Sequence, residues 1–305
     1  MPHLFIFGLG YSAGWIRAAA LARGWQVSAT GSAGDLPFDD EQAVRERLAR
    51  ATHVLSSIPP AREGDPVLAR YGDALPHDWL GYLSSTGVYG DTGGAWVDES
   101  APTLLPRGAA QADRLHGPPP IEGASHPGDP RPPPPQQGAA QHDTPAAAPP
   151  PAPTGRRTAR AEADAAWLHR GARVFRLPGI YGPGRSALDR VREGRAHRID
   201  LPEQVFSRVH VEDIASGVLA ALAAPPGAYN LADDLPASQN AVIEEACRLL
   251  GREPPPLLPL DEAGLSPMAR GFYAENRRVA NSKARRVLGW RPRYPDFRSG
   301  LTACL

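Results

Sequence analysis

The chain has 305 residues, enough to build one large hydrophobic core or a main domain with a smaller lobe. Its 33 basic and 33 acidic residues balance, so no net field favours nucleic acid or a membrane surface as a partner. Cys247 and Cys304 are too few for a disulfide framework and have no metal-ligand spacing, and no apolar stretch is long enough to cross a membrane. We therefore expect a cytoplasmic protein without a metal site, and the composition leaves a homodimer open.

An apolar strand, Phe5-Ile6-Phe7, opens the chain and is followed by a glycine turn and a helix over residues 15–23. A tight turn permits the backbone and the amides of the helix to approach a phosphate, and the helix macrodipole favours its negative charge. A glycine turn alone is a weak signal, but after a strand and before a helix it predicts that a dinucleotide diphosphate binds here. The residues expected at this turn, as cofactor contacts or as small residues that let the helix pack on the strand, are Gly8, Gly10, Tyr11, Ser12, Ala13 and Gly14.

The apolar, alanine-rich segment 4–22 would also suit a secretory signal. However, no lysine or arginine precedes the apolar run, and glycines interrupt it. We therefore expect this segment to belong to the nucleotide-binding fold.

Strand and helix patterns then alternate along the chain. This alternation predicts an α/β fold with a doubly wound parallel sheet that is covered on both faces. Ligands bind beyond the carboxyl ends of the strands in such sheets, where Ser57, Ser85, Pro178 and Gly179 are expected. The predicted strands are 25–29, 36–39, 52–58, 79–85 and 173–177, and the predicted helices are 41–50 and 159–169.

Residues 106–157 differ in composition from the rest of the chain. There are 14 prolines from Pro118 to Pro153, with almost no large apolar side chain among them. Such a segment cannot bury enough surface to offset its ordering entropy, so we predict a disordered Pro/Ala-rich insertion. A reading-frame slip in the gene and a partner-binding segment are alternatives that the sequence leaves open.

Five separated motifs occur in an order that resembles the extended short-chain dehydrogenase/reductase family, of the NAD-dependent epimerase/dehydratase type. The run from Ser266 to Val279 is most similar to an atypical bacterial branch, the YeeZ-like proteins. The resemblance implies a Rossmann-type core made by residues 1–105, 158–183 and 205–232, and a smaller C-terminal substrate lobe made by 184–204 and 233–305. The motifs are Ser84–Asp91 with Val97–Ser100, Arg176–Gly184, Arg208–Ala215, Tyr229–Leu231 and Leu288–Pro292.

The resemblance implies that Ser85 is the active-site hydroxyl that hydrogen-bonds the reacting oxygen. A Thr-Gly pair follows it where the family's dehydratases carry two acids, which disfavours sugar dehydration. The family's catalytic Tyr-x-x-x-Lys pair is absent, because Lys283 is the only lysine of the chain. An unperturbed tyrosine is ionised in about one molecule per thousand at pH 7, roughly 4 kcal/mol from a ready base. Tyr89 and Tyr181 are the remaining candidates, although packing roles in their loops are favoured.

The expected cofactor is NADP or NAD, with a slight preference for NADP. An NAD-preferring site usually has an acid at the end of the second strand, and here none occurs before Asp35. Thr30 and Ser32 could tolerate a 2′-phosphate, although no arginine is present there to hold it. Asp39 resembles the family's adenine-contacting acid, with a helix N-cap as the alternative role. Further cofactor contacts are expected at strand ends, from Ser57, Ile58 and Pro59 and, over the nicotinamide, from Pro178, Gly179 and Ile180.

Arg185 and Arg208 are the candidates for binding an anionic substrate group, because the arginine fork matches phosphate and carboxylate. Exposed surface positions are the alternative for both. Arg176 lies in a strand and suits an ordinary ion pair. His210 and Asp213 could form an acid/base pair, but a structural bond at a strand-to-helix junction is favoured.

These observations predict an NAD(P)-binding oxidoreductase or epimerase-like protein that acts on a small polar or nucleotide-sugar-like substrate. The missing tyrosine–lysine pair also supports a rival, a non-catalytic dinucleotide-binding sensor or interaction protein. A third alternative is a protein that the segment 106–157 has made nonfunctional.

Overall fold

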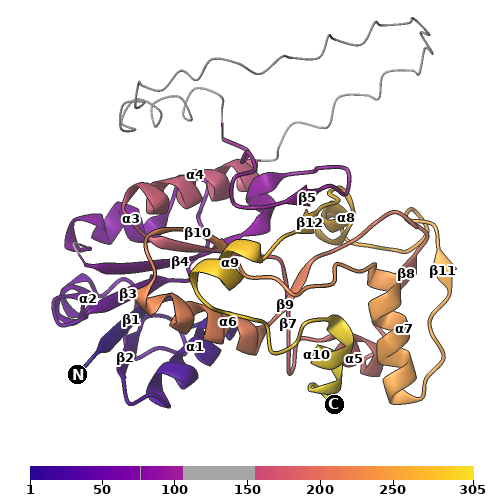
Figure 1. Ribbon diagram of the computed structural model, residues 1–305, viewed down its shortest axis with the longest axis horizontal. Helices are drawn as coiled ribbons and strands as arrows, with labels where there is room; N and C mark the ends of the chain where they lie inside the picture. The colour runs from indigo at the N-terminus through magenta and orange to yellow at the C-terminus, as the bar shows by residue number, and fades with distance from the viewer. Residues whose placement is uncertain (76, 106–154) are drawn as a thin grey trace, which may run out of the picture. The chain divides into compact units, whose positions relative to one another are not determined.

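The computed structural model describes residues 1–75, 77–105 and 155–305, without the side chains of 155–157 and 267–269. The centre of this part of the chain is a six-stranded, fully parallel sheet (Figure 1). The predicted doubly wound α/β fold is confirmed. In spatial order the strands are β10 (Gly227–Asn230), β6 (Arg173–Leu177), β4 (Trp79–Ser85), β3 (His53–Ser56), β1 (His3–Phe7) and β2 (Gln26–Ala29).

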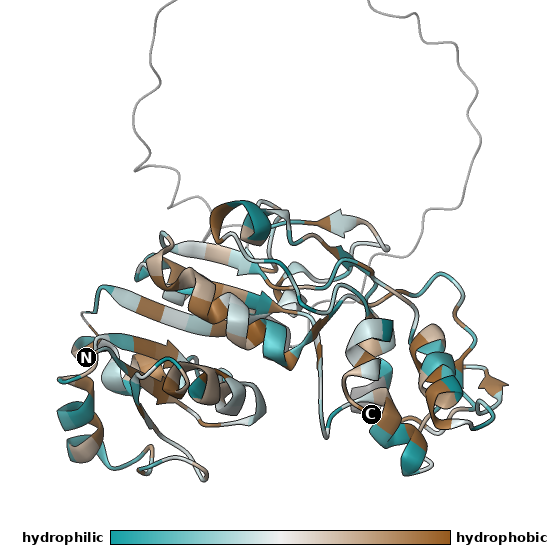
Figure 2. Ribbon diagram, turned by 60° about the horizontal axis from the view of Figure 1, so that its bottom comes forward, coloured by the Kyte–Doolittle hydropathy of each residue, from teal (hydrophilic) through white to brown (hydrophobic). Residues whose placement is uncertain are grey.

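Helices cover both faces of this sheet. α1 (Tyr11–Leu21) and α6 (Val211–Ala220) pack on one face, and the remaining sheet helices pack on the other (Figure 1). Hydrophobic and hydrophilic segments alternate along the helix ribbons in Figure 2, as expected of helices that bury one face. The helices of the second face are α2 (Glu41–Leu48), α3 (Pro66–Tyr71) and α4 (Gly155–His169).

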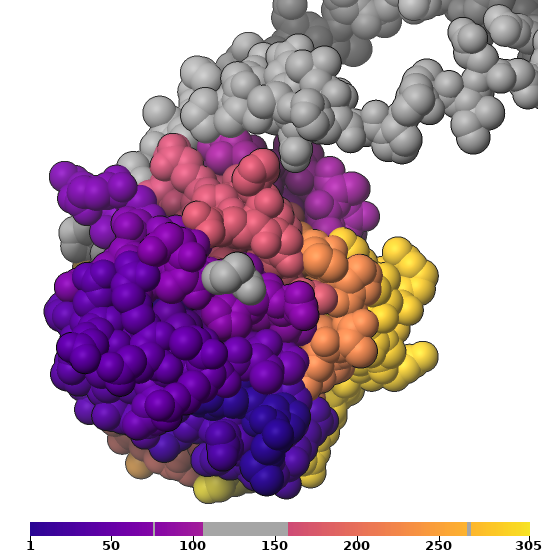
Figure 3. All heavy atoms as spheres, turned by 90° about the vertical axis from the view of Figure 1, so that its left-hand side faces the viewer, coloured from indigo at the N-terminus to yellow at the C-terminus, as the bar shows by residue number. Residues whose placement is uncertain are grey.

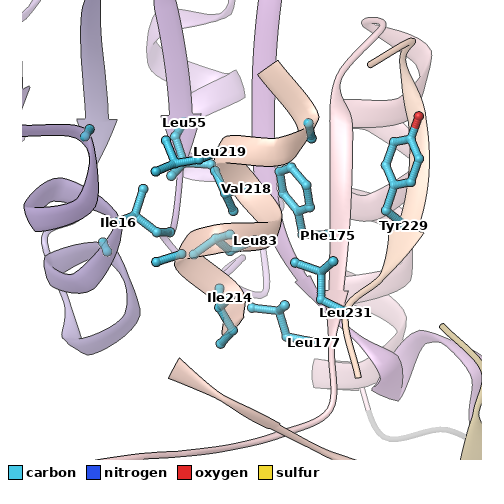
Figure 4. Close-up of a cluster of buried hydrophobic side chains, with 14 of the residues drawn as sticks. Ile16, Leu55, Leu83, Phe175, Leu177, Ile214, Val218, Leu219, Tyr229 and Leu231 are labelled. Carbon is cyan, nitrogen blue, oxygen red and sulfur yellow. The ribbon is translucent and has the colours of Figure 1, made fainter. Parts of the chain in front are cut away.

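The sequence of β1 explains how one strand serves both layers. Leu4 and Ile6 join the cluster under α1 and α6, whereas Phe5 and Phe7 join the cluster under α2, α3 and α4. Successive side chains of a strand point to opposite faces, so a run of apolar residues supplies both cores. Figure 4 shows the first cluster, in which side chains of α1, β3, β4, β6, α6 and β10 meet. Full burial of one such side chain stabilises the fold by roughly 1.5–3 kcal/mol.

The predicted third strand over 36–39 is wrong. Leu36 makes only an isolated parallel bridge to Thr30. The chain closes tightly after β2, because the Asp35 amide donates to the Ala29 carbonyl over 2.8 Å, and Pro37 has no N–H to continue a ladder. The sheet therefore ends at β2.

Two other boundaries also differ from the prediction. The helix expected from residue 15 begins at Tyr11, directly after the glycine turn. Residues 155–157, expected at the end of the disordered insertion, belong to α4, while 106–154 lie outside the described residues. In Figure 3 the atoms of the first hundred residues adjoin those of α4.

A third hydrophobic cluster lies in the region expected to form the substrate lobe. It joins α5 (Ala187–Arg192), α7 (Gln239–Leu250) and α10 (Phe297–Thr302). α7 is capped by the Ser238 side chain and ends at Gly251, whose φ of 63° is the left-handed conformation that glycine adopts readily. Short parallel pairs connect neighbouring segments: β7 (Gly179–Tyr181) with β9 (Arg208–His210), β8 (Arg198–Ile199) with β11 (Leu257–Leu258), and β5 (Trp96–Val97) with β12 (Arg278–Val279).

The remaining elements are short helical segments. η1 (Gly72–Ala74) follows α3, η2 (Thr86–Tyr89) follows β4, and η4 (Ala221–Ala223) follows α6. α8 (Pro267–Tyr273) and α9 (Ser282–Val287) lie in the C-terminal region. Among the described helices, none has the length and apolar character needed to span a membrane.

Candidate functional site

The strand order places a crevice at the carboxyl end of β1. The chain leaves β1 for β2 on one side and later returns to β3 on the other, which is the switch point where open α/β sheets bind ligands. The same edge carries Ser57 after β3, Ser85 at the end of β4 and Pro178 after β6, because Ser85 pairs with Leu177 in a parallel register. The fold thus brings the predicted strand-end residues to one edge.

Gly8 forms the tight bend at this switch point. Its φ is +82°, and a Cβ there would lie 2.7 Å from Cγ1 of Ile58. Its amide donates to Oγ1 of Thr30 over 3.0 Å, and the Ser57 hydroxyl donates to its carbonyl. These contacts fix the turn from two neighbouring strands and leave no room for a side chain. Pro59 follows Ile58 at the exposed start of the next loop.

Gly10 is the N-cap of α1 and has open space in front of it. No described atom lies within 4 Å of the place where its Cβ would be, and no side chain of the described chain caps the helix. The first turn, which starts with Tyr11, Ser12 and Ala13, has no acidic side chain. Its outward amides therefore suit an anion, which is the environment that a dinucleotide diphosphate requires. Ala13 is the small residue buried against the sheet, while Gly14 is only half-buried.

An open depression of about 400 Å³ lies at the loop that follows β2. It is lined by the loop after β2 from Gly31 to Phe38, including the exposed Ser32. Thr30 is fully buried and holds the Gly8 amide, so its side chain supports the turn rather than the depression. The Asp35 carboxylate accepts a hydrogen bond from the Ala29 amide over 2.8 Å and forms an ion pair with Arg17 at 3.4 Å.

Asp39 lies at the end of this loop and forms an exposed ion pair with Arg70. The alternative N-cap role is wrong, because α2 is capped by Asp40, whose Oδ1 accepts from the Ala43 amide over 3.1 Å. Adenine contact by Asp39 remains a prediction.

Ser85 ends β4, and its Oγ accepts a hydrogen bond from the Gly87 amide over 3.1 Å. No hydrogen bond from the Ser85 hydroxyl to another of the described residues is found, and the side chain is half-buried at the carboxyl edge of the sheet. The geometry suits a group that orients a reacting oxygen.

Tyr89 is turned away from such a role. Its hydroxyl donates to Oδ1 of Asn230 over 2.8 Å and accepts from Arg176 over 3.0 Å. Burial raises the pKa of the phenol. These contacts fit the packing role better than the catalytic one.

Behind Tyr89 lies a buried ion pair. Arg176 and Asp164 approach to 2.7 Å, and Asp164 also accepts from the Ser84 hydroxyl over 2.7 Å. Arg176 is thus the ion-pair partner that its strand position suggested. Sequence reasoning missed Asp164, although an acid on the apolar face of a helix was the available signal.

Tyr181 ends β7 and is also buried. Its hydroxyl donates weakly to the Asp296 carbonyl over 3.4 Å, and burial raises the pKa of the phenol far above its usual range. Pro178, Gly179 and Ile180 precede it and remain partly or fully exposed. They are therefore available to cover a ligand, whereas the Tyr181 hydroxyl is not.

The two candidate arginines lie in different environments. Arg185 is exposed, and its guanidinium carbon lies 5.6 Å from the centre of the Tyr11 ring at the start of α1. The Tyr11 hydroxyl donates to the Pro183 carbonyl over 3.0 Å, which holds this loop beside the glycine turn. Arg208 is buried and donates to backbone carbonyls of Phe206 and Ala237 at 2.9 and 2.8 Å. These contacts favour a structural role for Arg208.

His210 and Asp213 do not bond to one another. The Glu212 amide donates to Nδ1 of His210, while Asp213 accepts from the amides of Arg293 and Tyr294 at 2.6 and 3.1 Å. Burial raises the pKa of Asp213 to about 6. Both residues therefore serve the strand-to-helix junction and the C-terminal segment.

Asp233, which the sequence analysis did not single out, is the most perturbed carboxyl group near this region. It is buried, and neither oxygen has a hydrogen-bond partner among the described residues. Desolvation raises its pKa to about 8, despite the nearby positive charge of Arg208. The signal in the sequence was an acid that directly follows two apolar residues, Leu231 and Ala232, just after the last strand of the sheet.

Comparisons with known proteins agree with this geometry. No family model matches the chain. A conserved protein of unknown function from Silicibacter pomeroyi is 37% identical with a TM-score of 0.74, over 100% of this chain and 98% of that one. This chain belongs to the same family as that protein. UDP-glucose 4-epimerase from Thermus thermophilus, solved with NAD, has the same fold at 16% identity and a TM-score of 0.63, over 99% of this chain and 98% of that one. A human epimerase family protein, solved with NADPH, has the same fold at 15% identity and a TM-score of 0.65, over 98% of this chain and 97% of that one.

Two curated relatives match part of the chain. A 3-diazoavenalumate denitrifying reductase from a Streptomyces species is 33% identical over 49% of this chain and 52% of its own length. Protein YeeZ from Escherichia coli is 29% identical over 43% of this chain and 45% of its own length. The chain thus spans about half the length of the curated relatives it matches. The predicted fold of the NAD-dependent epimerase/dehydratase proteins and the predicted similarity to YeeZ are confirmed.

Proposed function

We propose that this protein is an NAD(P)-dependent oxidoreductase that acts on a small polar substrate. The observation that carries the proposal is the uncapped N-terminus of α1, which faces open space at Gly10 beside the switch point of the sheet. Backbone amides and a helix dipole there favour a diphosphate. Relatives of the same fold that were solved with NAD or NADPH add support.

Each part of the dinucleotide has residues of this chain to receive it. The amides of Tyr11, Ser12 and Ala13 would hold the diphosphate, and the depression beside Ser32 would receive the adenosine. The exposed edge from Pro178 to Ile180 would cover the nicotinamide, which supplies hydride chemistry when bound.

NADP is the favoured cofactor. The acid nearest the end of β2, Asp35, is held by a backbone amide and by Arg17, so its carboxylate is not free to grip a ribose 2′-hydroxyl. Ser32 is exposed in the depression and offers a neutral hydroxyl to a 2′-phosphate. Binding of NADPH in preference to NADH is the expected consequence.

Titration of the purified protein with NADPH and NADH tests the proposal, read by nicotinamide fluorescence and by thermal shift. Gly10→Ala should weaken binding at least about ten-fold, because a methyl group would fill the approach to the amides. Gly14→Ala, a matched change one turn further along α1, should bind as the wild type does. Absence of binding to the wild-type protein at millimolar dinucleotide would refute the proposal.

A non-catalytic dinucleotide-binding sensor is the second candidate. The observation that favours it is the placement of Lys283, whose Nζ lies 4.9 Å from the centre of the Tyr229 ring rather than near Ser85. Tight binding of the dinucleotide, without its oxidation by any diazonium, iminium or carbonyl acceptor, would support the sensor. A cytoplasmic setting and a homodimer remain predictions.

A further inference from the structure

We propose that this site transfers hydride to a cationic acceptor, such as an aryldiazonium ion, whose reduction needs no proton from a tyrosine. A sugar or aldehyde carbonyl, which needs such a proton, is the disfavoured acceptor. The inference rests on the proposed function, since it concerns the substrate class of the same site. The eight tyrosines and the single lysine of the chain are placed where none of them can supply a proton beside Ser85.

All eight tyrosines of the chain fall within the described residues, so their hydroxyl groups can be followed one by one. Seven of them have a polar protein partner, and six of these donate to an oxygen. A phenol whose proton is already donated inside the protein cannot donate it to a substrate without breaking that bond. The pairs are Tyr11 with Pro183 O, Tyr71 with Phe38 O, Tyr89 with Asn230 Oδ1, Tyr181 with Asp296 O, Tyr229 with Pro225 O, Tyr294 with Glu212 Oε2 and, through a ring nitrogen, Tyr273 with His197 Nε2.

Tyr82 is the exception, and it cannot reach a ligand. Its hydroxyl has no partner among the described residues, but the side chain is fully buried and stacks on Trp167 of α4, with ring centres 5.4 Å apart. Desolvation raises the pKa of this phenol well above its usual range, which makes it a poorer acid. Tyr82 therefore belongs to the core between sheet and helix.

The lysine is at the wrong edge of the sheet. A Cβ at Gly227, the first residue of β10, would lie 3.5 Å from Nζ of Lys283. Gly227 pairs with Arg173 at the start of β6, whereas Ser85 pairs with Leu177 at its end. Lys283 therefore lies near the amino ends of the strands and cannot lower the pKa of a phenol beside Ser85.

Ser85 remains as the hydroxyl at the reaction edge. Its proton is free to orient an electronegative atom, but a serine hydroxyl is too weak an acid to protonate a developing alkoxide unaided. Reduction of a carbonyl places hydride on carbon and requires a proton on oxygen in the same reaction. General acid catalysis of that proton transfer contributes typically 10²–10⁴-fold. A carbonyl substrate would lose most of this factor here.

A diazonium ion makes no such demand. A bound reduced dinucleotide would supply hydride to the terminal nitrogen of Ar–N≡N⁺, which would give the neutral diazene Ar–N=N–H and leave the dinucleotide oxidised by two electrons. The diazene would then lose N₂ and give Ar–H. The hydrogen of its N–H group becomes the new hydrogen on the ring, so no external proton is needed. The relative named 3-diazoavenalumate denitrifying reductase, 33% identical to half of this chain, supports an acceptor of this kind.

The test compares acceptors that differ only in the reacting group. Purified full-length protein with NADPH is given 4-carboxybenzenediazonium or 4-carboxybenzaldehyde, and NADPH oxidation and N₂ release are followed. A cyclic iminium ion serves as a second cationic acceptor, and a UDP-4-keto-sugar as a second carbonyl. Because diazonium ions react slowly with NADPH alone, the rate without protein is subtracted from each measurement, and Gly10→Ala treated in the same way serves as the control with weakened dinucleotide binding.

We expect both cationic acceptors to be reduced at least about a hundred-fold faster than the two carbonyls. Carbonyl turnover at a comparable or higher rate would overturn the inference, and so would NADPH binding without turnover of any acceptor. Failure of the wild-type protein to bind NADPH at all would instead refute the proposed function, and thermal shift measures that separately.

Discussion

Gly8→Ala is the substitution that most directly tests the structure of the nucleotide site. The φ of +82° costs an alanine roughly 1–2 kcal/mol relative to glycine. The new methyl group would also lie 2.7 Å from Cγ1 of Ile58 and 3.3 Å from Oγ of Ser57, and overpacking of this kind costs roughly 1–3 kcal/mol. We therefore expect the free energy of unfolding to fall by about 2–5 kcal/mol.

Gly10→Ala is the matched control for this measurement. Its φ of −91° suits any residue, and no described atom lies within 4 Å of the added methyl group. Loss of a glycine N-cap and reduced freedom of the unfolded chain act in opposite directions, so stability should stay within about 1 kcal/mol of wild type.

Urea denaturation, followed by circular dichroism, distinguishes the two variants. We expect Gly8→Ala to lose stability whether or not dinucleotide is present, and Gly10→Ala to keep its stability and lose affinity for dinucleotide. A Gly8→Ala protein as stable as the wild type would show that Gly8 does not form the bend, and the reasoning about the diphosphate site would fail with it.

Three further predictions concern the C-terminal region, a buried acid and the exposed arginine. Gly300→Ala should lower the free energy of unfolding by at least about 2 kcal/mol, because the new Cβ would overlap the phenol of Tyr181; an unchanged urea midpoint would contradict this packing. The pKa of Asp233 is about 8 in the folded protein, above its unfolded value of 3.8. Its contribution to the free energy of unfolding is therefore most favourable below about pH 4 and declines as pH rises to 8, by up to about 1.4 kcal/mol per pH unit. Asp233→Asn should remove this decline, and equal slopes for both proteins in unfolding measured from pH 5 to 8 would refute it. Arg185→Ala should weaken NADPH binding about ten-fold at low salt, whereas Arg195→Ala, which removes the same charge from an exposed pair with Glu193, should not; equal affinities in a fluorescence titration would exclude a diphosphate contact.

Most of the sheet was predictable from the sequence because parallel strands buried on both faces have continuous apolar runs. Phe5-Ile6-Phe7 and Val174-Phe175 satisfy that condition, and both lie in central strands. Residues 36–39 misled the prediction because Leu36 and Phe38 are apolar at strand spacing. Their burial instead comes from packing beside Tyr71, with ring centres of Phe38 and Tyr71 5.4 Å apart, and Pro37 prevents a regular ladder.

The parts of the candidate site that depend on backbone conformation were predictable from the sequence. The parts that depend on side-chain contacts were less predictable. Gly8 and Gly10 are defined by local conformation, which the glycine spacing already indicates. Arg208 and Thr30 have residue types that suit a ligand, but their partners are distant in sequence: Ala237 O for the guanidinium and the Gly8 amide for the hydroxyl. Pairings of that kind depend on the folded topology and leave no local pattern in the sequence.

The motifs that indicate the family mostly stabilise the scaffold rather than perform chemistry. Asn230 connects Tyr89 to the Ala280 carbonyl, at 2.8 and 3.1 Å, and Trp290 donates to the Ser216 hydroxyl over 2.9 Å. Asp213 holds the segment that follows Trp290 through two backbone amides. A chain can therefore keep these motifs, and the fold that they stabilise, whether or not it has a tyrosine–lysine pair. The resemblance is accordingly stronger support for the scaffold and its crevice than for a sugar substrate, and the acceptor class has to be inferred from the hydroxyl that remains at this edge of the sheet, that of Ser85.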